Sequence, residues 1–189
     1  MTRHPPGYTG PTSRRTIGGT TLVVGLGSPD RGDDAVGSAV ASAVAALGMP
    51  DVEVVVHEDP TDLIELWSGF DRVVIVDAVR SGATPGTLRT LETAQGRAPL
   101  PQSAWSRTGR GGTHAFGVAA AIELGRALRR LPRRLTLVGV EARAFEHGTP
   151  LSPEVAAAIP GAVSAVLTLV GTGTVGTPAP SRGRAHVPG

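Results

Sequence analysis

The segment Thr21-Leu-Val-Val-Gly-Leu-Gly-Ser-Pro-Asp-Arg-Gly-Asp-Asp-Ala-Val-Gly37 decides the fold class. It begins with a short apolar run rich in β-branched residues, which predicts a strand buried on both faces of a parallel sheet. A glycine-rich turn follows, and after it apolar residues recur at helical spacing at Val36, Val40 and Val44. A strand, a turn and a helix in this order predict the first unit of an α/β domain.

The same alternation continues along the chain. Three further apolar runs and one weaker strand candidate are found at residues 52–57, 72–76, 135–140 and 86–92. Helical spacing recurs over 118–128 and again over 155–166, where Pro160 predicts a kink. We therefore predict an α/β fold, a three-layer α/β/α sandwich with right-handed crossovers.

Composition predicts one folded domain, residues 20–171, within the 189-residue chain. Residues 1–19 and 172–189 are rich in Gly, Pro, Ser, Thr and Arg without periodicity, so we expect disordered tails. No apolar run approaches the roughly 18 residues that cross a bilayer, so we expect no membrane span.

The charge distribution argues against nucleic-acid binding. All 18 basic residues are arginines, and five of them lie in the two tails, which leaves 13 arginines against 16 acids in the domain. No basic stripe with interleaved aromatic residues is present. The absence of cysteine excludes disulfides and thiolate chemistry.

Four polar residues fall where an open α/β sheet places its ligands, outside the carboxyl ends of the strands. Asp33 and Asp34 follow the first predicted strand, Asp77 ends the third, and His114 begins a helix after an aperiodic connection, residues 93–112. Two carboxylates and an imidazole converging at one edge would suit a divalent transition metal.

Each candidate also has a structural interpretation. Asp33 and Asp34 fit the role of helix caps, and a histidine at a helix start is commonly structural. Glu141 lies just beyond the fifth predicted strand and could support the site. His57 and His147 have no partner at a recognisable spacing, so we interpret them as surface residues.

Four motifs, in this order, resemble the hydrogenase maturation protease family. They are Gly25–Gly37, Val76-Asp77-Ala78, Thr113-His114-Ala-Phe-Gly117 and Leu137-Val-Gly-Val-Glu141, and the resemblance spans residues 21–170. It implies a five-stranded, mostly parallel sheet with one antiparallel strand, for which residues 86–92 are the candidate. It places the catalytic and metal-contacting roles on Asp34, Asp77 and His114, and leaves Asp33 to the helix start.

The resemblance also implies an activity. Members of the family are endopeptidases that remove the C-terminal extension of a [NiFe]-hydrogenase large-subunit precursor after nickel has been inserted. We accordingly expect a cytoplasmic monomer whose partner is that precursor, with nickel carried by the substrate and no organic cofactor. The sequence leaves open whether the metal polarises the carbonyl or activates water, or whether a carboxylate acts as the base. It departs from the usual family pattern at Ser28, Ala35 and Gly111-Gly112.

Two other α/β classes share part of this pattern. A phosphoacceptor receiver domain shares the acidic pair and the Asp after the third strand, but it needs a lysine and the chain has none. A dinucleotide-binding domain would use Gly25-Leu-Gly27, but the third glycine of its motif would fall on Asp30.

Overall fold

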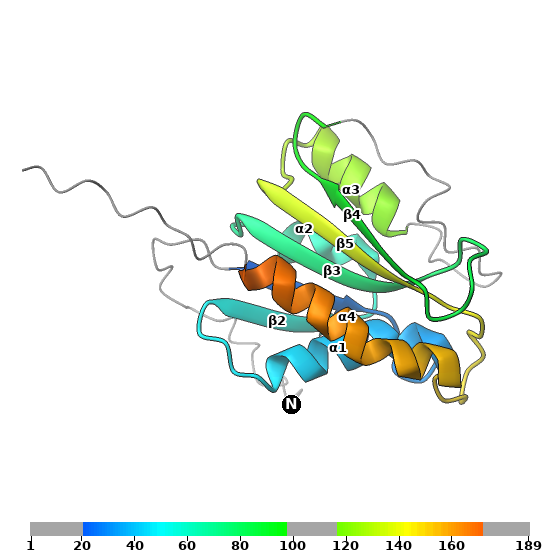
Figure 1. Cartoon of the computed structure of the whole chain (residues 1–189). Helices are drawn as coiled ribbons and strands as arrows, with labels where there is room; N and C mark the ends of the chain where they lie inside the picture. Colours follow the sequence, from blue (N-terminus) through cyan, green and yellow to red (C-terminus); the bar gives the residue numbers. More distant parts are fainter. Residues whose placement is uncertain (1–20, 98–116, 172–189) are drawn as a thin grey trace, which may run out of the picture.

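The computed structural model describes residues 21–97 and 117–171 (Figure 1). In chain order the elements are β1 Thr21–Leu26, η1 Gly32–Ala35, α1 Val36–Ala45, β2 Val52–His57, η2 Pro60–Asp62, α2 Leu63–Leu66, β3 Arg72–Val79, β4 Leu88–Thr93, α3 Val118–Ala127, β5 Arg134–Glu141 and α4 Pro153–Gly171. The tails expected to be disordered, residues 1–19 and 172–189, lie outside the described residues, and so does residue 20 at the start of the predicted domain.

The five strands form one sheet in the order β2-β1-β3-β5-β4. All neighbours are parallel except β4, which runs antiparallel to β5. This confirms the predicted mostly parallel sheet and its one antiparallel strand. It also differs from receiver domains, in which the fourth strand lies between the third and fifth.

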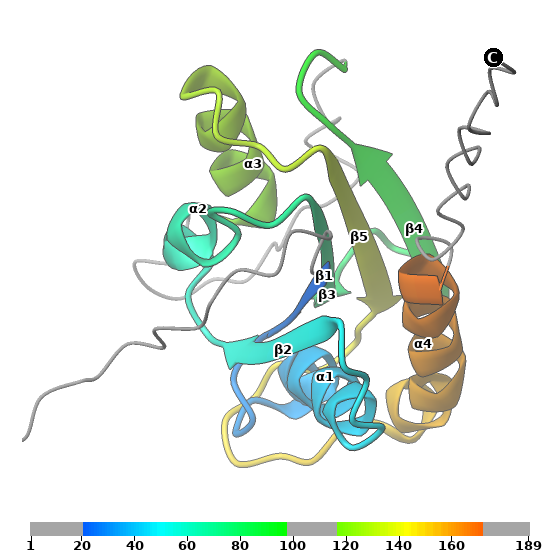
Figure 2. The same cartoon turned by 90° about the vertical axis from the view of Figure 1, so that its left-hand side faces the viewer.

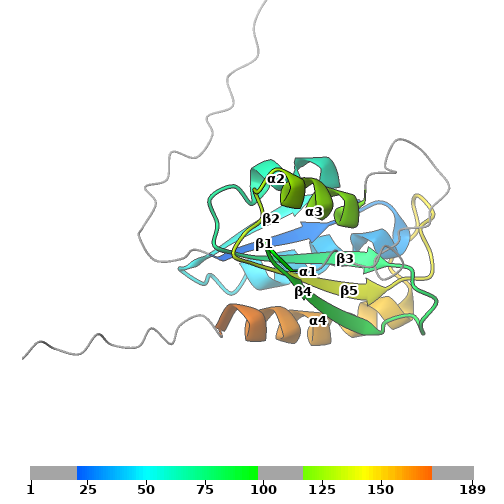
Figure 3. The same ribbon diagram turned by 90° about the horizontal axis from the view of Figure 1, so that it is seen from above.

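Helices cover both faces of the sheet, which confirms the three-layer sandwich. Figures 2 and 3 show α1 and α4 on one face and α2 and α3 on the other. The alternation of side chains along β3 divides the core accordingly: Val74 and Val76 pack in the cluster of α1 and α4, and Val73 and Ile75 in that of α2 and α3.

Two glycines allow α1 to lie directly on the sheet. A Cβ at Gly25 would clash with the carbonyl oxygen of Gly37, and a Cβ at Gly37 would clash with the carbonyl oxygens of Leu26 and Val76. The helix therefore starts in contact with the ends of β1 and β3. This close approach fixes the position of the turn between β1 and α1, which carries the acidic pair.

Several element boundaries differ from the sequence-based expectations. β3 continues to Val79, because its partner β5 continues in register to Glu141. α3 begins at Val118 with Gly117 in an extended conformation before it, later than the expected start at His114. α4 spans 19 residues, Pro153–Gly171, and so extends beyond the apolar pattern over 155–166; it contains Pro160.

Helix α4 is the one element of the described residues that is long and apolar enough to cross a membrane, a length that the sequence patterns did not predict. Helices in the cores of globular proteins meet the same criterion. In the structure α4 lies against α1 and β5, and it buries Val155, Ala162 and Val166 in the core.

Candidate active site

Asp34 lies in a tight turn that the backbone holds in place. Gly27 has φ +117°, and a Cβ there would clash with the carbonyl oxygen of Asp34. The N–H of Ser28 donates to Asp34 Oδ2 at 3.0 Å, and the side chain of Asp34 is 2% exposed. Because this contact uses the main chain of Ser28, the departure from the family pattern at this position does not remove it.

Asp77 lies on the middle strand of the sheet. It is opposite Gly139 of β5 and is fully buried. We predicted that it ends the strand, but two more strand residues follow it. A carboxylate buried in a strand is costly unless other groups compensate it.

The fold brings the segments of Asp34 and Asp77 together. The turn η1, which contains Asp34, contacts β3, and Gly37 lies against the carbonyl oxygen of Val76, next to Asp77. Both carboxylates therefore lie near the carboxyl ends of two adjacent parallel strands, as the sequence predicts.

The third predicted ligand, His114, lies outside the described residues. Within residues 21–97 and 117–171 there is no group of three His, Asp or Glu side chains that could hold a metal ion. The three-residue site therefore stays a prediction, with two of its members placed near one edge of the sheet.

Asp33 has a different role from the one that its sequence position predicts. Neither η1 nor α1 has a side-chain cap, so the helix-cap interpretation of Asp33 is wrong. Its Oδ2 accepts the N–H groups of Arg143 at 2.8 Å and Ala144 at 2.9 Å, and its Oδ1 accepts the N–H of Ser152 at 2.6 Å. The side chain is fully buried and fastens the connection between β5 and α4.

These contacts also set the ionisation of Asp33. Burial alone would raise the pKa of this carboxyl, but the backbone hydrogen bonds from Ser152, Ala144 and Arg143 outweigh it, and the pKa lies below its ordinary value. Asp33 is therefore a carboxylate at neutral pH.

Main-chain hydrogen bonds join the same two segments. Gly32 donates to Thr149 at 3.0 Å, Asp33 to Ala144 at 2.8 Å, and Gly148 to Asp30 at 2.8 Å. The connection between β5 and α4, residues 142–152, is thus held against the turn that carries Asp34. We call these residues the clamped loop.

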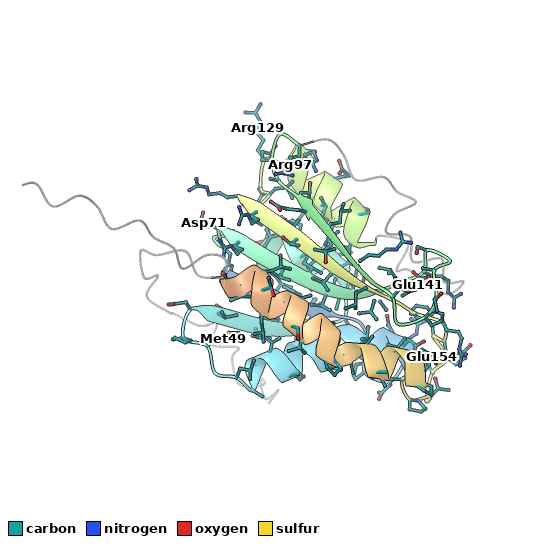
Figure 4. All side chains as sticks on the ribbon, in the orientation of Figure 1. Met49, Asp71, Arg97, Arg129, Glu141 and Glu154 are labelled. Atoms are coloured by element: carbon teal, nitrogen blue, oxygen red, sulfur yellow. The ribbon has the colours of Figure 1, made fainter. Side chains whose placement is uncertain are left out.

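Glu141, the last residue of β5, holds the loop that follows β3. Its Oε1 accepts the N–H groups of Ser81 at 2.8 Å and Gly82 at 2.9 Å, and its Oε2 accepts the Ser81 hydroxyl at 2.6 Å. The side chain is 2% exposed. Since both oxygens bind this turn, Glu141 holds the connection after β3 in place. Figure 4 shows that Glu141 lies at the same end of the molecule as Glu154.

The two histidines within the described residues are His57 and His147. His57 Nε2 lies 2.9 Å from Asp62 Oδ2, a partner that the sequence spacing did not reveal, and its side chain is partly exposed. His147 is exposed in the clamped loop, as expected of a surface residue.

The sequence patterns did not reveal the contacts of Asp33, nor the contact of Arg80 with Phe145 of the clamped loop. These contacts join residues 60 or more positions apart, and no spacing rule connects such positions.

Comparisons with known proteins agree with this geometry. The sequence model of the hydrogenase maturation protease family, HycI, matches residues 58–169. The search of curated proteins found no significant match.

Three solved structures share the fold at more than 25% sequence identity. The hydrogenase maturating endopeptidase HybD from E. coli is 26% identical with a TM-score of 0.64, and the match covers 80% of this chain and 92% of HybD. An endopeptidase from Escherichia coli, solved in solution, is 28% identical with a TM-score of 0.67, covering 79% of this chain and 91% of that one. A hydrogenase 2 maturation peptidase from Thaumarchaeota archaeon SCGC_AB-539-E09 is 27% identical with a TM-score of 0.55, covering 80% and 97%.

The family match extends over more than half of the chain and includes β3 with Asp77. The structural matches cover about four fifths of it. The chain belongs to the hydrogenase maturation protease family and is an endopeptidase of that family.

Proposed function

We propose that this endopeptidase removes the C-terminal extension of a [NiFe]-hydrogenase large-subunit precursor, and that it does so after nickel insertion. The observation that carries the proposal is the pair of buried carboxylates, Asp34 and Asp77, near the carboxyl ends of adjacent strands in a chain of this family. This edge is where an open α/β sheet binds its ligands.

In this proposal the nickel ion arrives with the substrate. Asp34, Asp77 and His114 would supply two carboxylate oxygens and one imidazole nitrogen to a nickel ion that the precursor already holds. Such a donor set suits a divalent transition metal. A precursor without nickel would lack this anchor, and the enzyme would discriminate against it.

The backbone contacts of the turn support this use of Asp34. The N–H of Ser28 fixes one carboxylate oxygen, and Gly27 lets the main chain pass close to it. A carboxylate oriented in this way loses little conformational entropy when it binds a metal.

No organic cofactor takes part in the proposed reaction. We place the reaction in the cytoplasm, where the precursor is synthesised.

Cleavage of the purified precursor, with and without nickel, tests the proposal. We expect one cut near the C-terminus of the nickel-loaded precursor and no cut in the nickel-free one, measured by mass spectrometry. Equal cleavage of both forms would refute nickel-dependent recognition. Cleavage of neither form would refute the precursor as the substrate.

A further inference from the structure

An arginine, Arg80, directly follows the carboxyl end of β3. Arg80 comes after Val79, the last strand residue, and three positions after Asp77. Its Nη2 donates to the carbonyl oxygen of Arg143 at 2.7 Å, and its guanidinium carbon lies 4.9 Å from the centroid of the Phe145 ring. Both contacts are with the clamped loop.

These contacts orient the guanidinium without neutralising it. A carbonyl group and an aromatic ring carry no net charge, and among the described residues no carboxylate forms an ion pair with Arg80. The residue is exposed. A guanidinium has five N–H donors, and one of those of Arg80 donates to the carbonyl oxygen of Arg143.

The neighbouring arginine differs in this respect. Arg143 Nη1 lies 3.3 Å from Glu154 Oε1, so its charge has a partner. The pair is largely exposed and therefore weak. Arg80 is thus the better receptor for an anion that arrives with another molecule.

A purely structural role would be to fasten the clamped loop. That loop is already held by the carboxylate of Asp33 and by main-chain hydrogen bonds to Gly32 and Asp30. One exposed hydrogen bond from Arg80 adds little to such an arrangement. The loop therefore positions Arg80, more than Arg80 positions the loop.

The strand fixes the distance from Arg80 to the site. At a rise of about 3.3 Å per residue, three positions place Arg80 about 10 Å beyond Asp77. An extended peptide covers the same distance in about three residues. Side chains alternate across a strand, so Asp77 shares a face with Val79, whereas Arg80 lies toward Phe145 on the other face. A substrate chain that crosses this end of the sheet from Asp77 would bring a side chain about three residues from the cleaved bond next to Arg80.

We propose that Arg80 is a specificity-determining residue that binds a carboxylate side chain of the precursor, about three residues from the cleaved bond. This inference rests on the proposed function, since it needs the precursor as substrate. Arginine suits the role because its planar donors match a carboxylate, and here its orientation is preset by Phe145 and the Arg143 carbonyl.

Steady-state cleavage of the nickel-loaded precursor by Arg80→Gln and by Arg80→Lys tests the proposal. We expect Arg80→Gln to raise KM about tenfold and to leave kcat and the melting temperature near those of the wild type. Arg80→Lys should fall between the two, because it keeps the charge but loses the planar donors. Arg133→Gln is the matched control, since Arg133 is an exposed arginine next to the amino end of β5, at the opposite edge of the sheet.

The second arm changes the precursor. Each acidic residue within four positions of the cleaved bond is replaced by its amide, and one replacement should raise KM for the wild type but not for Arg80→Gln. Arg80→Glu should regain affinity for a precursor in which that acid is a lysine. Such a rescue by charge reversal is not expected of a residue that only supports a loop.

Several results would overturn the inference: an unchanged KM for Arg80→Gln, independent effects of the two changes, a precursor with no acid in that range, or a loss that tracks a lower melting temperature. Failure of the wild type to cleave the nickel-loaded precursor would refute the proposed function itself, and the inference with it. Normal cleavage by the wild type combined with any of the four results would refute the role of Arg80 alone.

Discussion

Replacing Asp33 by asparagine should destabilise the fold measurably. The carboxylate accepts three backbone N–H groups, at 2.6, 2.8 and 2.9 Å. An amide offers one oxygen, so in either orientation its NH₂ group faces at least one backbone donor. The change loses one charge-assisted hydrogen bond, worth about 1.5–3 kcal/mol, and weakens the others, for a total of about 3 kcal/mol.

That loss should appear in thermal melting. For a domain of this size about 1 kcal/mol corresponds to about 2–4 °C, so Asp33→Asn should melt about 6–12 °C lower at pH 7. Asp71→Asn is the matched control, because Asp71 is an exposed aspartate at the other end of the molecule from Glu141 (Figure 4). It should melt within about 2 °C of the wild type.

The pH dependence gives a second signature. The folded-state pKa of Asp33 is lowered from its ordinary value of 3.8, so its contribution to the free energy of unfolding is present above that value. It is lost as the pH falls below 3.8 toward the folded-state pKa. The difference in melting temperature between wild type and Asp33→Asn should therefore be constant above about pH 5 and shrink below pH 4. Equal melting at pH 7, or a difference that does not shrink in acid, would refute the role assigned to this carboxylate.

The remaining predictions concern the site and its supports. Asp77→Asn should abolish precursor cleavage in an in vitro assay and leave a cooperative melt, because it removes the anionic ligand but keeps the shape; cleavage at the normal rate would exclude Asp77 from the site. His114→Ala should lose cleavage and bind nickel or cadmium at least about tenfold more weakly by calorimetry, with weaker binding by the wild type as the pH falls toward about 5.5, since the ligand must be neutral. The same change at His57 should leave cleavage intact, and identical behaviour of the two variants would contradict the site. Glu141→Gln should lower the melting temperature by about 2–8 °C, because its two oxygens accept three hydrogen bonds from one turn; an unchanged melt would contradict that role. A chain of residues 20–171 should cleave the precursor at the full-length rate, and loss of activity on trimming would show that the arginine-rich ends take part in docking.

The fold could be predicted from the sequence because its signals are local. Four of the strands are short apolar runs: β1, β2, β3 and β5. Each run can be recognised in the sequence without knowledge of the strands that it pairs with. The boundaries were less accurate where pairing decides them. The extension of β3 to Val79 follows from the length of β5, which residues 72–76 alone do not reveal.

The supporting contacts of the site could not be predicted in this way. Asp33 binds main-chain N–H groups 110 to 119 positions later, and Glu141 binds a turn 59 and 60 positions earlier. Main-chain donors are present at every residue except proline, so they leave no mark in the sequence. Only the acidic residues can be recognised in the sequence, and the position of Asp33 just before a predicted helix suggests that it caps that helix.

The adjacent acids Asp33 and Asp34 illustrate how one short motif can serve two purposes. In a 3₁₀ turn successive side chains point about 120° apart, so neighbouring residues face different surroundings. Asp33 turns toward the clamped loop and binds three of its N–H groups, whereas Asp34 is held by Ser28 beside the end of β1. The clamped loop in turn carries the carbonyl of Arg143 and the ring of Phe145 that orient Arg80. The carboxylate of Asp33, together with main-chain hydrogen bonds between the two segments, therefore links the turn that presents Asp34 to the loop that positions Arg80.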